Sequence, residues 1–585
     1  PDRNRHHDLI YKTCYQQQKM VTQETTKTTS KRRRDITRYL IAIVVLVLVN
    51  VLVYNYFFRI DLTEDKRYSI SPVTKQMLGN LPEEVFVEVY LEGDFPSGFK
   101  RLQQSVRETL DEFRIYADGK VRYSFYDPNS ITDEKKRAAF MQQLAQKGIQ
   151  PTNLKATEEG KQVERLVFPG AVIRYKGKET AVNFLKGNLA ATPDERLNQS
   201  VEGVEYELAT AVRKVAFQGN KTIGYITGQG ELEYQQVTDL LGSLQQYYRV
   251  AMGDLDQIPT LDGLDLIIVA KPTGTYSDAD KYKIDQFIMK GGKAVFFVDA
   301  LDASLDSLGS GGTFAMPYNH NLDDLFFRYG VRLNPTLIMD LNSGFIPMVT
   351  GYTGGRPATE MINWRFYPLL NKYSKHPITR NLDAVYSKFV GTIDTVKAAG
   401  VRKTPLVYTS RYSRIMQAPV PLTLEEARMK VNPEQYQAGE QPVGYLLEGT
   451  FTSLFRNRRA PAGAANTTVK EQGVPTQIAV FSDGDLIRND VNPRTGQAYE
   501  LGFDRFNNIK FANKELAMNT IHYLLDSEGL INVRSKEIKL RPLDRVRVQE
   551  EKTYWQALNL AAPIALLILF GITRYYLRKR KYEKF

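Results

Sequence analysis

The sequence contains very little cysteine and histidine. Cys14 is the one cysteine among 585 residues, so the chain beyond it can form no internal disulfide. The histidines outside the first ten residues are His320, His376 and His522, and none stands at metal-ligand spacing from another. Because protein zinc sites are built mainly from closely spaced Cys and His residues, we expect no metal site. A fold of this length must therefore rely on its hydrophobic core.

The motifs of nucleotide hydrolysis and of serine hydrolases are also missing. The chain has no Gly-x-x-x-x-Gly-Lys-Ser/Thr loop, whose backbone N–H groups would hold phosphates, and no Gly-x-Ser-x-Gly nucleophile turn. We therefore predict that the protein is not an ATPase. We expect no catalytic residues and no cofactor.

Away from its two ends, the chain has almost no excess of either charge. The net charge of +12 comes from residues 1–38, with ten Lys and Arg against four Asp and Glu, and from residues 574–585, with six against one. A nucleic-acid-binding protein would spread its cations over a folded surface, so no nucleic-acid partner is predicted. Residues 1–19 show no periodicity, and Met20 is the expected natural start, which makes residues 1–19 an extension in front of it.

The first of two long hydrophobic runs covers residues 40–58. It carries no charge, and fourteen of its nineteen residues are Leu, Ile, Val or Phe. At 1.5 Å per residue, such a helix spans about the ~30 Å of a bilayer's hydrocarbon core. The bulky residues 54–58 differ from the small residues of a signal-peptide cleavage site. We therefore predict an uncleaved transmembrane helix at 39–58.

The second run, residues 557–572, is bordered by aromatic residues and followed by a basic tail. These flanks are typical of a membrane interface and of its cytoplasmic side, and they predict a second transmembrane helix at 555–573. Positive charge precedes the first run and follows the second. Both tails, 1–38 and 574–585, are therefore expected in the cytoplasm of a bacterium, with the domain between them in the periplasm.

Three asparagines fall within the predicted spans: Asn50, Asn55 and Asn559. An amide in hydrocarbon can hydrogen-bond to a neighbouring transmembrane helix, which makes all three candidates for intramembrane packing against a partner. Placement toward water or at the membrane interface is the equal alternative.

The segment between the spans alternates strand and helix patterns, which predicts an α/β fold. Residues 60–218 predict a membrane-proximal α/β domain. Residues 220–530 predict a Rossmann-like domain with a parallel sheet, because residues 222–299 read as βαβαβ with one almost wholly apolar strand. An irregular insertion is expected at about 341–475, with strands near 392–397, 404–409 and 443–451. A stalk is expected at 531–554.

Polar residues follow several predicted strands of the Rossmann-like domain. Strand ends of a parallel sheet gather at one edge, where α/β proteins usually bind ligands. A dinucleotide site is not expected, because Glu233 replaces the third glycine of that fingerprint. These residues are either ordinary turn residues or contacts to a ligand or partner. The candidates are Gly228, Gln229, Gly230, Glu231, Asp299, Asp483 and Asp485.

Three motifs suggest a family. They are Leu-Thr-Glu-Asp-Lys-Arg-Tyr-Ser-Ile-Ser at 62–71, Ile-Thr-Gly-Gln-Gly-Glu at 226–231 and Phe-Ser-Asp-Gly-Asp-Leu at 481–486. With the two spans and basic tails, the chain resembles GldG, the gliding-motility-associated ABC transporter auxiliary protein, over about residues 30–580. The resemblance implies a non-enzymatic subunit of a bacterial inner-membrane complex. Implied partners are an ABC ATPase subunit, a multi-span permease subunit and further periplasmic motility or secretion components.

Three functions remain open at this point. The first is a coupling subunit that relays ATP-driven changes from the cytoplasm to a periplasmic partner. The second is a solute-binding module tethered to its transporter. The third is a periplasmic hydrolase that uses Asp483, Asp485 and Glu231.

Overall fold

The chain divides into two compact units, Pro1–Tyr68 and Ser69–Phe585. The computed structural model describes residues 36–51 and 69–583, apart from 159–160, 187–191, 218–220, 306–307, 309–311, 354–355, 463, 465–467, 493, 527–528 and 536–550. Several predicted features lie outside the described residues, namely most of the leading tail, the end of the first span with Asn55, the start of the 62–71 motif and most of the stalk.

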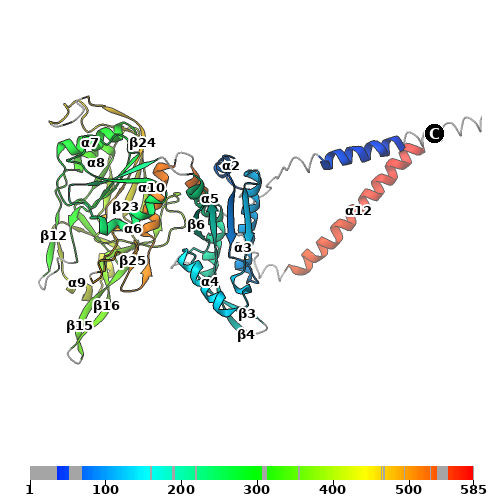
Figure 1. The fold of residues 1–585 in the computed structure, drawn as a ribbon, viewed down its shortest axis with the longest axis horizontal. Coiled ribbons are helices and arrows are strands. Elements are labelled where there is room, and N and C mark those ends of the chain that lie inside the picture. The colour runs from blue at the N-terminus through cyan, green and yellow to red at the C-terminus, as the bar shows by residue number, and fades with distance from the viewer. Residues whose placement is uncertain are drawn as a thin grey trace, which may run out of the picture. The chain divides into compact units, whose positions relative to one another are not determined.

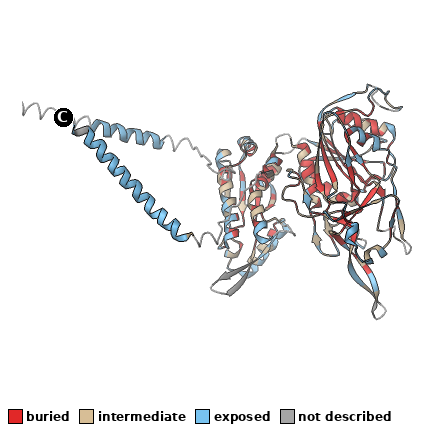
Figure 2. Cartoon of the chain, turned by 180° about the vertical axis from the view of Figure 1, so that it is seen from behind, coloured by how far each residue is buried: buried red, intermediate tan, exposed pale blue. Residues whose placement is uncertain are grey.

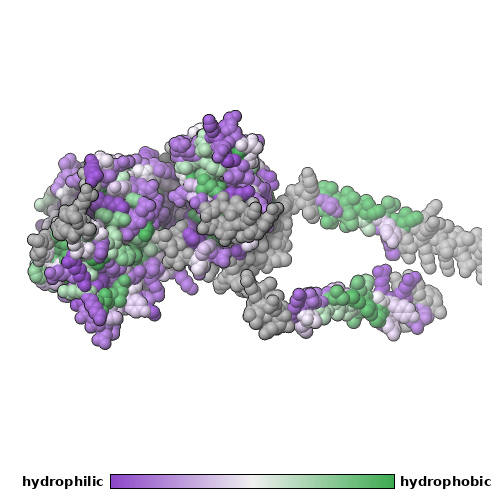
Figure 3. Space-filling model, turned by 90° about the horizontal axis from the view of Figure 1, so that it is seen from below, coloured by the Kyte–Doolittle hydropathy of each residue, from purple (hydrophilic) through white to green (hydrophobic). Residues whose placement is uncertain are grey.

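Among the described residues, one helix is long and apolar enough to cross a membrane. It is Lys552–Arg580, within α12 (Lys552–Tyr582), and its apolar side chains are exposed. The first predicted span appears as a shorter apolar helix, Ile36–Val51. Both helices carry hydrophobic surface in Figure 3. The structure thus contains one candidate span where the sequence predicts two, because residues 52–58 of the first run are not described.

The smaller α/β region, residues 72–216, is built on a four-stranded sheet. Its order is β2-β1-β5-β6, with β1 and β2 parallel and the other pairs antiparallel. The strands are β1 (Val85–Val89), β2 (Val121–Phe125), β5 (Gly170–Tyr175) and β6 (Lys178–Asn183). The helices are α2 (Pro72–Gly79), α3 (Ser97–Tyr116), α4 (Glu134–Gln146) and α5 (Pro193–Ala216), and β3 (Thr152–Glu158) pairs with β4 (Lys161–Val167) (Figure 1).

Local sequence explains where these helices begin. Ser71 accepts a hydrogen bond from the Thr74 backbone N–H at the start of α2, with Pro72 as the first helical residue. Thr192 and Glu195 form a capping box at the start of α5. Apolar residues recur at helical spacing along α3 and α5, and they pack against the sheet in one core.

The larger α/β region, residues 222–525, is built on an eight-stranded sheet of order β17-β20-β23-β24-β10-β9-β7-β8. The five strands from β24 to β8 are parallel to one another. Beyond β24, the strands β23, β20 and β17 follow, and each is antiparallel to the strand before it in the sheet. The parallel sheet predicted from residues 222–299 is therefore present, but three antiparallel strands extend it into a mixed sheet. The strands are β7 (Thr222–Thr227), β8 (Arg249–Asp254), β9 (Leu266–Ala270), β10 (Lys293–Phe297), β17 (Lys372–Tyr373), β20 (Val401–Tyr408), β23 (Pro442–Thr452) and β24 (Gln472–Phe481).

Helices cover both faces of this sheet, and the buried core lies on both sides of it (Figure 2). Alternate residues of β9 show why: Leu266, Ile268 and Ala270 pack toward one face, and Ile267 and Val269 toward the other. The first face is covered by α6 (Tyr234–Gln245) and α10 (Asn513–Leu525), and the second by α7 (Asp278–Met289) and α8 (Asp323–Tyr329).

Residues 341–475, predicted as an irregular insertion with three strands, contain those strands as β19 (Ile393–Thr395), β20 and β23, and β20 and β23 join the main sheet. Their Tyr, Thr and Val content suits strands. Further pairs are β15 (Ser343–Thr353) with β16 (Arg356–Leu370), and β25 (Phe503–Asp504) with β26 (Ile509–Lys510). The remaining elements are β11 (Leu301–Asp302), β12 (Thr313–Pro317), β13 (Val331–Leu333), β14 (Thr336–Asp340), β18 (Val385–Tyr386), β21 (Ser413–Gln417), β22 (Val420–Leu422) and α9 (Glu425–Arg428).

After α10 the chain returns to the core of the smaller region. The short helix η4 (Leu530–Ser535) buries Leu530, Ile531 and Val533 in the core that contains α5. The first residues of the predicted stalk are therefore packed, because their apolar side chains need a core. Arg213 of α5 also pairs with Asp526 at 3.3 Å.

His522, near the end of α10, is buried in its neutral form. Its Nδ1 forms a hydrogen bond with the Tyr248 hydroxyl at 2.7 Å. Burial, and then the charges of Arg213, Arg534 and Lys214, lower the pKa of His522 to about 3. Protonation of the ring would add a further positive charge near these cations, which is unfavourable.

This depressed pKa predicts a loss of stability in mild acid. In the unfolded chain His522 takes up a proton below about pH 6.5, whereas the folded chain stays neutral until about pH 3. Stability should therefore fall as pH drops through this window, by about 2 kcal/mol between pH 7 and pH 5 from this residue. Denaturant unfolding of wild type and His522→Gln at both pH values checks this. The difference between them should shrink at pH 5, and a difference independent of pH would contradict the prediction.

Candidate functional site

The carboxyl ends of β24, β10, β9 and β7 lie side by side at one edge of the large sheet, as their parallel pairing requires. Backbone hydrogen bonds continue beyond the strands. Lys271 N–H donates to the Phe297 carbonyl at 2.7 Å, and Val298 N–H donates to the Phe481 carbonyl at 3.0 Å. The sequence-predicted residues follow three of these strands.

Lys271, directly after β9, is the centre of the aspartate cluster at this edge. Its Nζ lies 2.9 Å from an Asp299 carboxylate oxygen and also pairs with Asp485, and all three side chains are buried. The Asp299 carboxylate accepts a second hydrogen bond, from Gly484 N–H at 2.5 Å. Asp483 accepts one from Asp485 N–H at 2.7 Å. The aspartates after β10 and β24 are therefore held together by a lysine after β9.

The fold shifts the pKa values of the aspartates in this cluster in opposite directions. Burial would lower the pKa of Lys271, but attraction to Asp299 and Asp485 outweighs it and raises that pKa. Burial would raise the pKa of Asp485, but Lys271 and two further cations outweigh it and lower that pKa. Burial, and then repulsion by Asp299 and Asp485, raises the pKa of Asp483 well above its usual range. Burial also raises the pKa of Asp299, against the opposing charge of Lys271.

The backbone at this point is unusually close-packed. Lys271 has a φ of +51°, a conformation that non-glycine residues rarely adopt and that often marks functional positions. A Cβ on Gly484 would lie 2.5 Å from the Lys271 Cβ and 2.9 Å from its Cα. Only glycine fits there, and its absence of a side chain lets η3 (Gly484–Ile487) approach the lysine.

The turn from Gly228 to Glu231 forms a separate group at the same edge. The Gln229 carbonyl accepts hydrogen bonds from Thr273 N–H at 3.1 Å and from Gly274 N–H at 2.7 Å. The Glu231 carboxylate accepts from Gln229 N–H at 2.8 Å and from the Tyr276 hydroxyl. Burial raises the pKa of Glu231. The helix α6 begins only at Tyr234, so the two glycines lie before its N-terminus.

The candidate residues thus form two groups. Asp299 and Asp485 pair with Lys271, and Asp483 accepts from the Asp485 N–H, whereas Glu231 is bound to Tyr276. The two groups share the loop after β9. Each carboxylate already accepts hydrogen bonds within the fold, so the three acids proposed for a hydrolase do not share one site.

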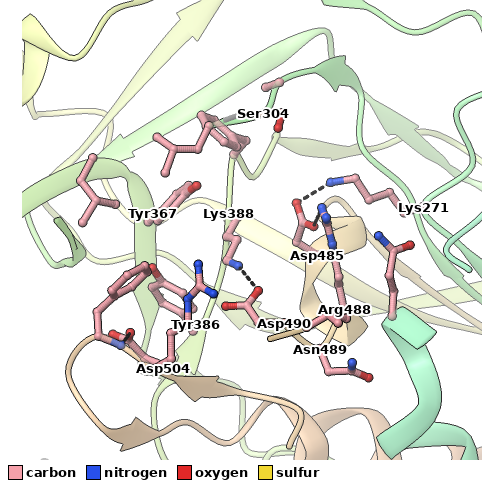
Figure 4. A pocket seen from close by; sticks show the side chains of 18 of the residues that line it. Lys271, Ser304, Tyr367, Tyr386, Lys388, Asp485, Arg488, Asn489, Asp490 and Asp504 are labelled. Carbon is pink, nitrogen blue, oxygen red and sulfur yellow. Dashed lines mark hydrogen bonds and ion pairs between the residues drawn. The ribbon is translucent and has the colours of Figure 1, made fainter. Parts of the chain in front are cut away.

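A cavity of about 300 Å³ opens beside the Lys271 cluster. Lys271 and Asp485 line it, and Figure 4 shows Lys388 and Arg488 pointing toward the same space from different segments. Lys388 Nζ pairs with Asp490 at 3.1 Å, and Arg488 pairs with Asp485 at 3.4 Å. Tyr367, Tyr386, Phe389, Phe345 and Phe506 supply its aromatic surface. Its volume lies at the lower end of the range for small-molecule sites.

Within the described part of the chain, no three His, Cys, Asp or Glu side chains are placed to hold a metal ion. Of the intramembrane candidates, Asn50 donates to the Leu46 carbonyl of its own helix at 2.9 Å, and Asn559 lies within α12. The helix therefore satisfies part of the hydrogen-bonding capacity of Asn50 by itself.

Comparison with known proteins identifies the larger region. Residues 220–520, half of the chain, match the family described as "ABC-type uncharacterized transport system", an auxiliary family of ABC transport. The chain belongs to this family. Residues 64–174 of the auxiliary protein match a second model, a domain of unknown function named DUF7088. All residues that line the cavity fall within the first match.

One relative matches over nearly the whole chain. A protein of Borreliella burgdorferi without a functional name is 21% identical over 558 residues, which cover 92% of the auxiliary protein and 97% of that relative. Solved structures are less similar. The N-terminal domain of mmIFT52 superposes with a TM-score of 0.29 at 12% identity, over 52% of this chain and 97% of that one. PurLQS from Thermotoga maritima gives a TM-score of 0.22 at 11% identity, over 52% and 100%. Neither score supports a conclusion about function.

The sequence predictions missed the cations of the site. Lys271 could have been found, because it directly follows a wholly apolar strand that ends at the same edge. Lys388 and Arg488 stand in no recognisable motif, and only the fold brings them to the cavity.

Proposed function

We propose that this ABC transporter auxiliary protein is a non-catalytic, membrane-anchored coupling subunit. In this proposal it links a cytoplasmic ABC ATPase subunit and a multi-span permease subunit to periplasmic partners. The setting is bacterial gliding motility and its associated secretion, as the resemblance to GldG implies. The observation that carries the proposal is the auxiliary-family region at 220–520 in a chain that ends in an apolar helix of membrane-spanning length.

The non-catalytic part of the proposal draws on the Lys271 cluster. The aspartates at the sheet edge are held by a buried lysine and by backbone N–H groups, which suits a fixed structural role. The sequence also has no phosphate-binding loop, so energy from ATP must come from another subunit.

Affinity purification of the tagged full-length chain in mild detergent tests the proposal. An ABC ATPase and a multi-span permease should co-purify in fixed ratio. Replacing both Leu566 and Leu567 with arginine should remove them, because each arginine near the centre of a span costs about 2.5–3.5 kcal/mol. The matched double replacement by alanine should retain them. Recovery of a lone chain under several gentle conditions would count against a coupling subunit.

The proposed topology, with two spans and both ends in the cytoplasm, predicts a simple labelling pattern. The single cysteine allows a Cys14→Ser background with one new thiol at a time. Lys397→Cys, at an exposed position, should react with a membrane-impermeant maleimide in spheroplasts. Lys579→Cys should react only after the membrane is opened. Labelling of Lys579→Cys in sealed spheroplasts would place the C-terminus outside and reject this topology.

A tethered solute-binding module is the second candidate function, and the cavity beside Lys271 favours it. The two functions are compatible, since a coupling subunit can respond to a ligand. Thermal-shift screening with small polar solutes tests this candidate, and a screen in which no solute raises the melting temperature would oppose it.

A further inference from the structure

The cavity beside Lys271 has more unused hydrogen-bond donors than acceptors. An arginine guanidinium carries five N–H donors. Arg488 forms one ion pair, with Asp485 at 3.4 Å. Within the described residues, Arg505 forms no ion pair and lies over the Phe506 ring, 4.7 Å from its centre. Lys388 contributes further N–H groups beyond its bond to Asp490.

By contrast, two carboxylates of the cavity already accept several hydrogen bonds from the protein. Asp485 accepts from both Lys271 and Arg488. Asp504 accepts from the backbone N–H groups of Phe506 and Asn507 and from the Asn507 side-chain amide. A ligand must therefore supply acceptors. A carboxylate matches a guanidinium best, because its two oxygens can accept two parallel N–H bonds.

The local charge favours one negative charge over two. Four cations line the cavity together with three carboxylates, and buried Asp299, which pairs with Lys271, brings the charges into balance. The cations are Lys271, Lys388, Arg488 and Arg505, and the lining carboxylates are Asp485, Asp490 and Asp504. In this neutral setting each negative charge of a ligand adds to the repulsion from the nearby aspartates, so a single charge is accepted more readily than the two charges of a phosphate.

Aromatic rings at the cavity mouth indicate what accompanies the carboxylate. Phe345, at the start of β15, is 43% exposed, and Phe506, in the turn between β25 and β26, is 49% exposed. Tyr386 also lines the cavity and stacks on Phe511, with ring centres 5.2 Å apart. Large exposed rings beside a concave site are typical of ligand contact, and they pack well against a flat apolar group.

We propose that this cavity binds a compact monocarboxylate that carries an aromatic group, with the carboxylate on Arg488 and Lys388 and the ring against Phe506 and Tyr386. A free aromatic acid and the C-terminus of a short peptide both present this chemistry. The proposal adds a ligand site to the auxiliary protein, and it does not depend on the coupling function.

Calorimetric titration of the detergent-purified full-length protein tests the site. The probes are phenylacetate, its neutral amide phenylacetamide, N-acetylglycylphenylalanine, the amide of that peptide, and inorganic phosphate. Each acid should bind at least about tenfold more tightly than its amide, because the amide loses the charge-assisted bonds. Tighter binding of phenylacetate indicates a free acid as the natural ligand, and tighter binding of the peptide indicates a C-terminus. Equal binding of acids and amides, stronger binding of phosphate, or no heat from any acid at millimolar concentration would overturn the proposal.

Matched variants locate the effect in the cavity. Arg488→Gln should weaken the acids at least about tenfold and leave the amides unchanged, since only the charged group is lost. Arg402→Gln removes an arginine of β20 that does not line the cavity, and it should bind like wild type. Phe506→Ala changes an exposed ring, and it should weaken acids and amides alike. Wild-type affinity in both Arg488→Gln and Phe506→Ala would overturn the assignment. Retained co-purification of transporter subunits with Arg488→Gln separates this result from the coupling function.

Discussion

Replacing Lys271 with methionine should lower the free energy of unfolding by about 3 to 5 kcal/mol, because it leaves buried Asp299 without its cation and Asp485 with Arg488 alone. Lys271 pairs with both Asp299 and Asp485, and all three side chains are at most 10% exposed. Guanidinium unfolding measures the change, with fluorescence of buried Trp364 as the reporter. A Trp555→Phe background removes the one other tryptophan.

The exposed pair of Lys290 and Asp262 provides the matched control. Its atoms lie 2.7 Å apart, but both side chains are about half exposed. Lys290→Met should therefore cost less than about 1 kcal/mol. Adding Asp299→Asn and Asp485→Asn to Lys271→Met should recover part of the loss, since the uncompensated charges disappear. If Lys271→Met is as stable as Lys290→Met, the cluster does not hold the strand ends together.

Replacing Asp285 with alanine should cost a similar amount, about 3 to 6 kcal/mol, because it leaves several buried donors without an acceptor. Asp285 lies within α7 and is completely buried. Its carboxylate accepts from the Ser453 hydroxyl at 2.6 Å, the Leu454 N–H at 2.8 Å, the Tyr329 hydroxyl at 2.9 Å and the Gln286 amide at 2.9 Å. The same Trp364 unfolding experiment measures the loss.

Asp285→Asn separates the acceptor from the charge. Asparagine keeps the shape and one acceptor oxygen, so about 1 to 2 kcal/mol should be lost. Burial raises the pKa of Asp285, which means that the neutral form of this side chain is more favoured in the folded chain than in the unfolded chain. Asp262→Ala, at an exposed position, should change little. Equal stability of Asp285→Ala and Asp262→Ala would show that the hydrogen bonds to α7 contribute nothing.

Much of the larger region follows from local pattern. The all-apolar β9 and the capped helix α7 alternate as a doubly wound sheet requires, because burial on two faces needs continuous apolar strands. The antiparallel strands β20 and β23 were harder to place. Their order in the sheet depends on pairing between segments far apart in the chain, and strand patterns do not encode partners.

The candidate site, too, was predictable from the sequence only in part. Strand-end positions of Asp299 and Asp485 could be read from the sequence, since parallel strands bring their carboxyl ends together. Nothing in the sequence indicated that the pKa of Asp483 is raised while that of Asp485 is lowered. Those shifts depend on the distance of each carboxylate from Lys271 and on burial, both of which arise only in the folded chain.

By itself, the sequence determined that the chain has an apolar terminal helix, α/β layers and polar strand ends, because hydrophobic period and turn residues are local properties. Tertiary structure alone decided that the aspartates share one lysine, that Glu231 belongs to Tyr276, and that Lys388 and Arg488 meet in one cavity. Those contacts join residues as many as 214 positions apart, as with Lys271 and Asp485. The physical reason is that charge pairing acts through space, whereas the patterns of a sequence record only neighbours along the chain.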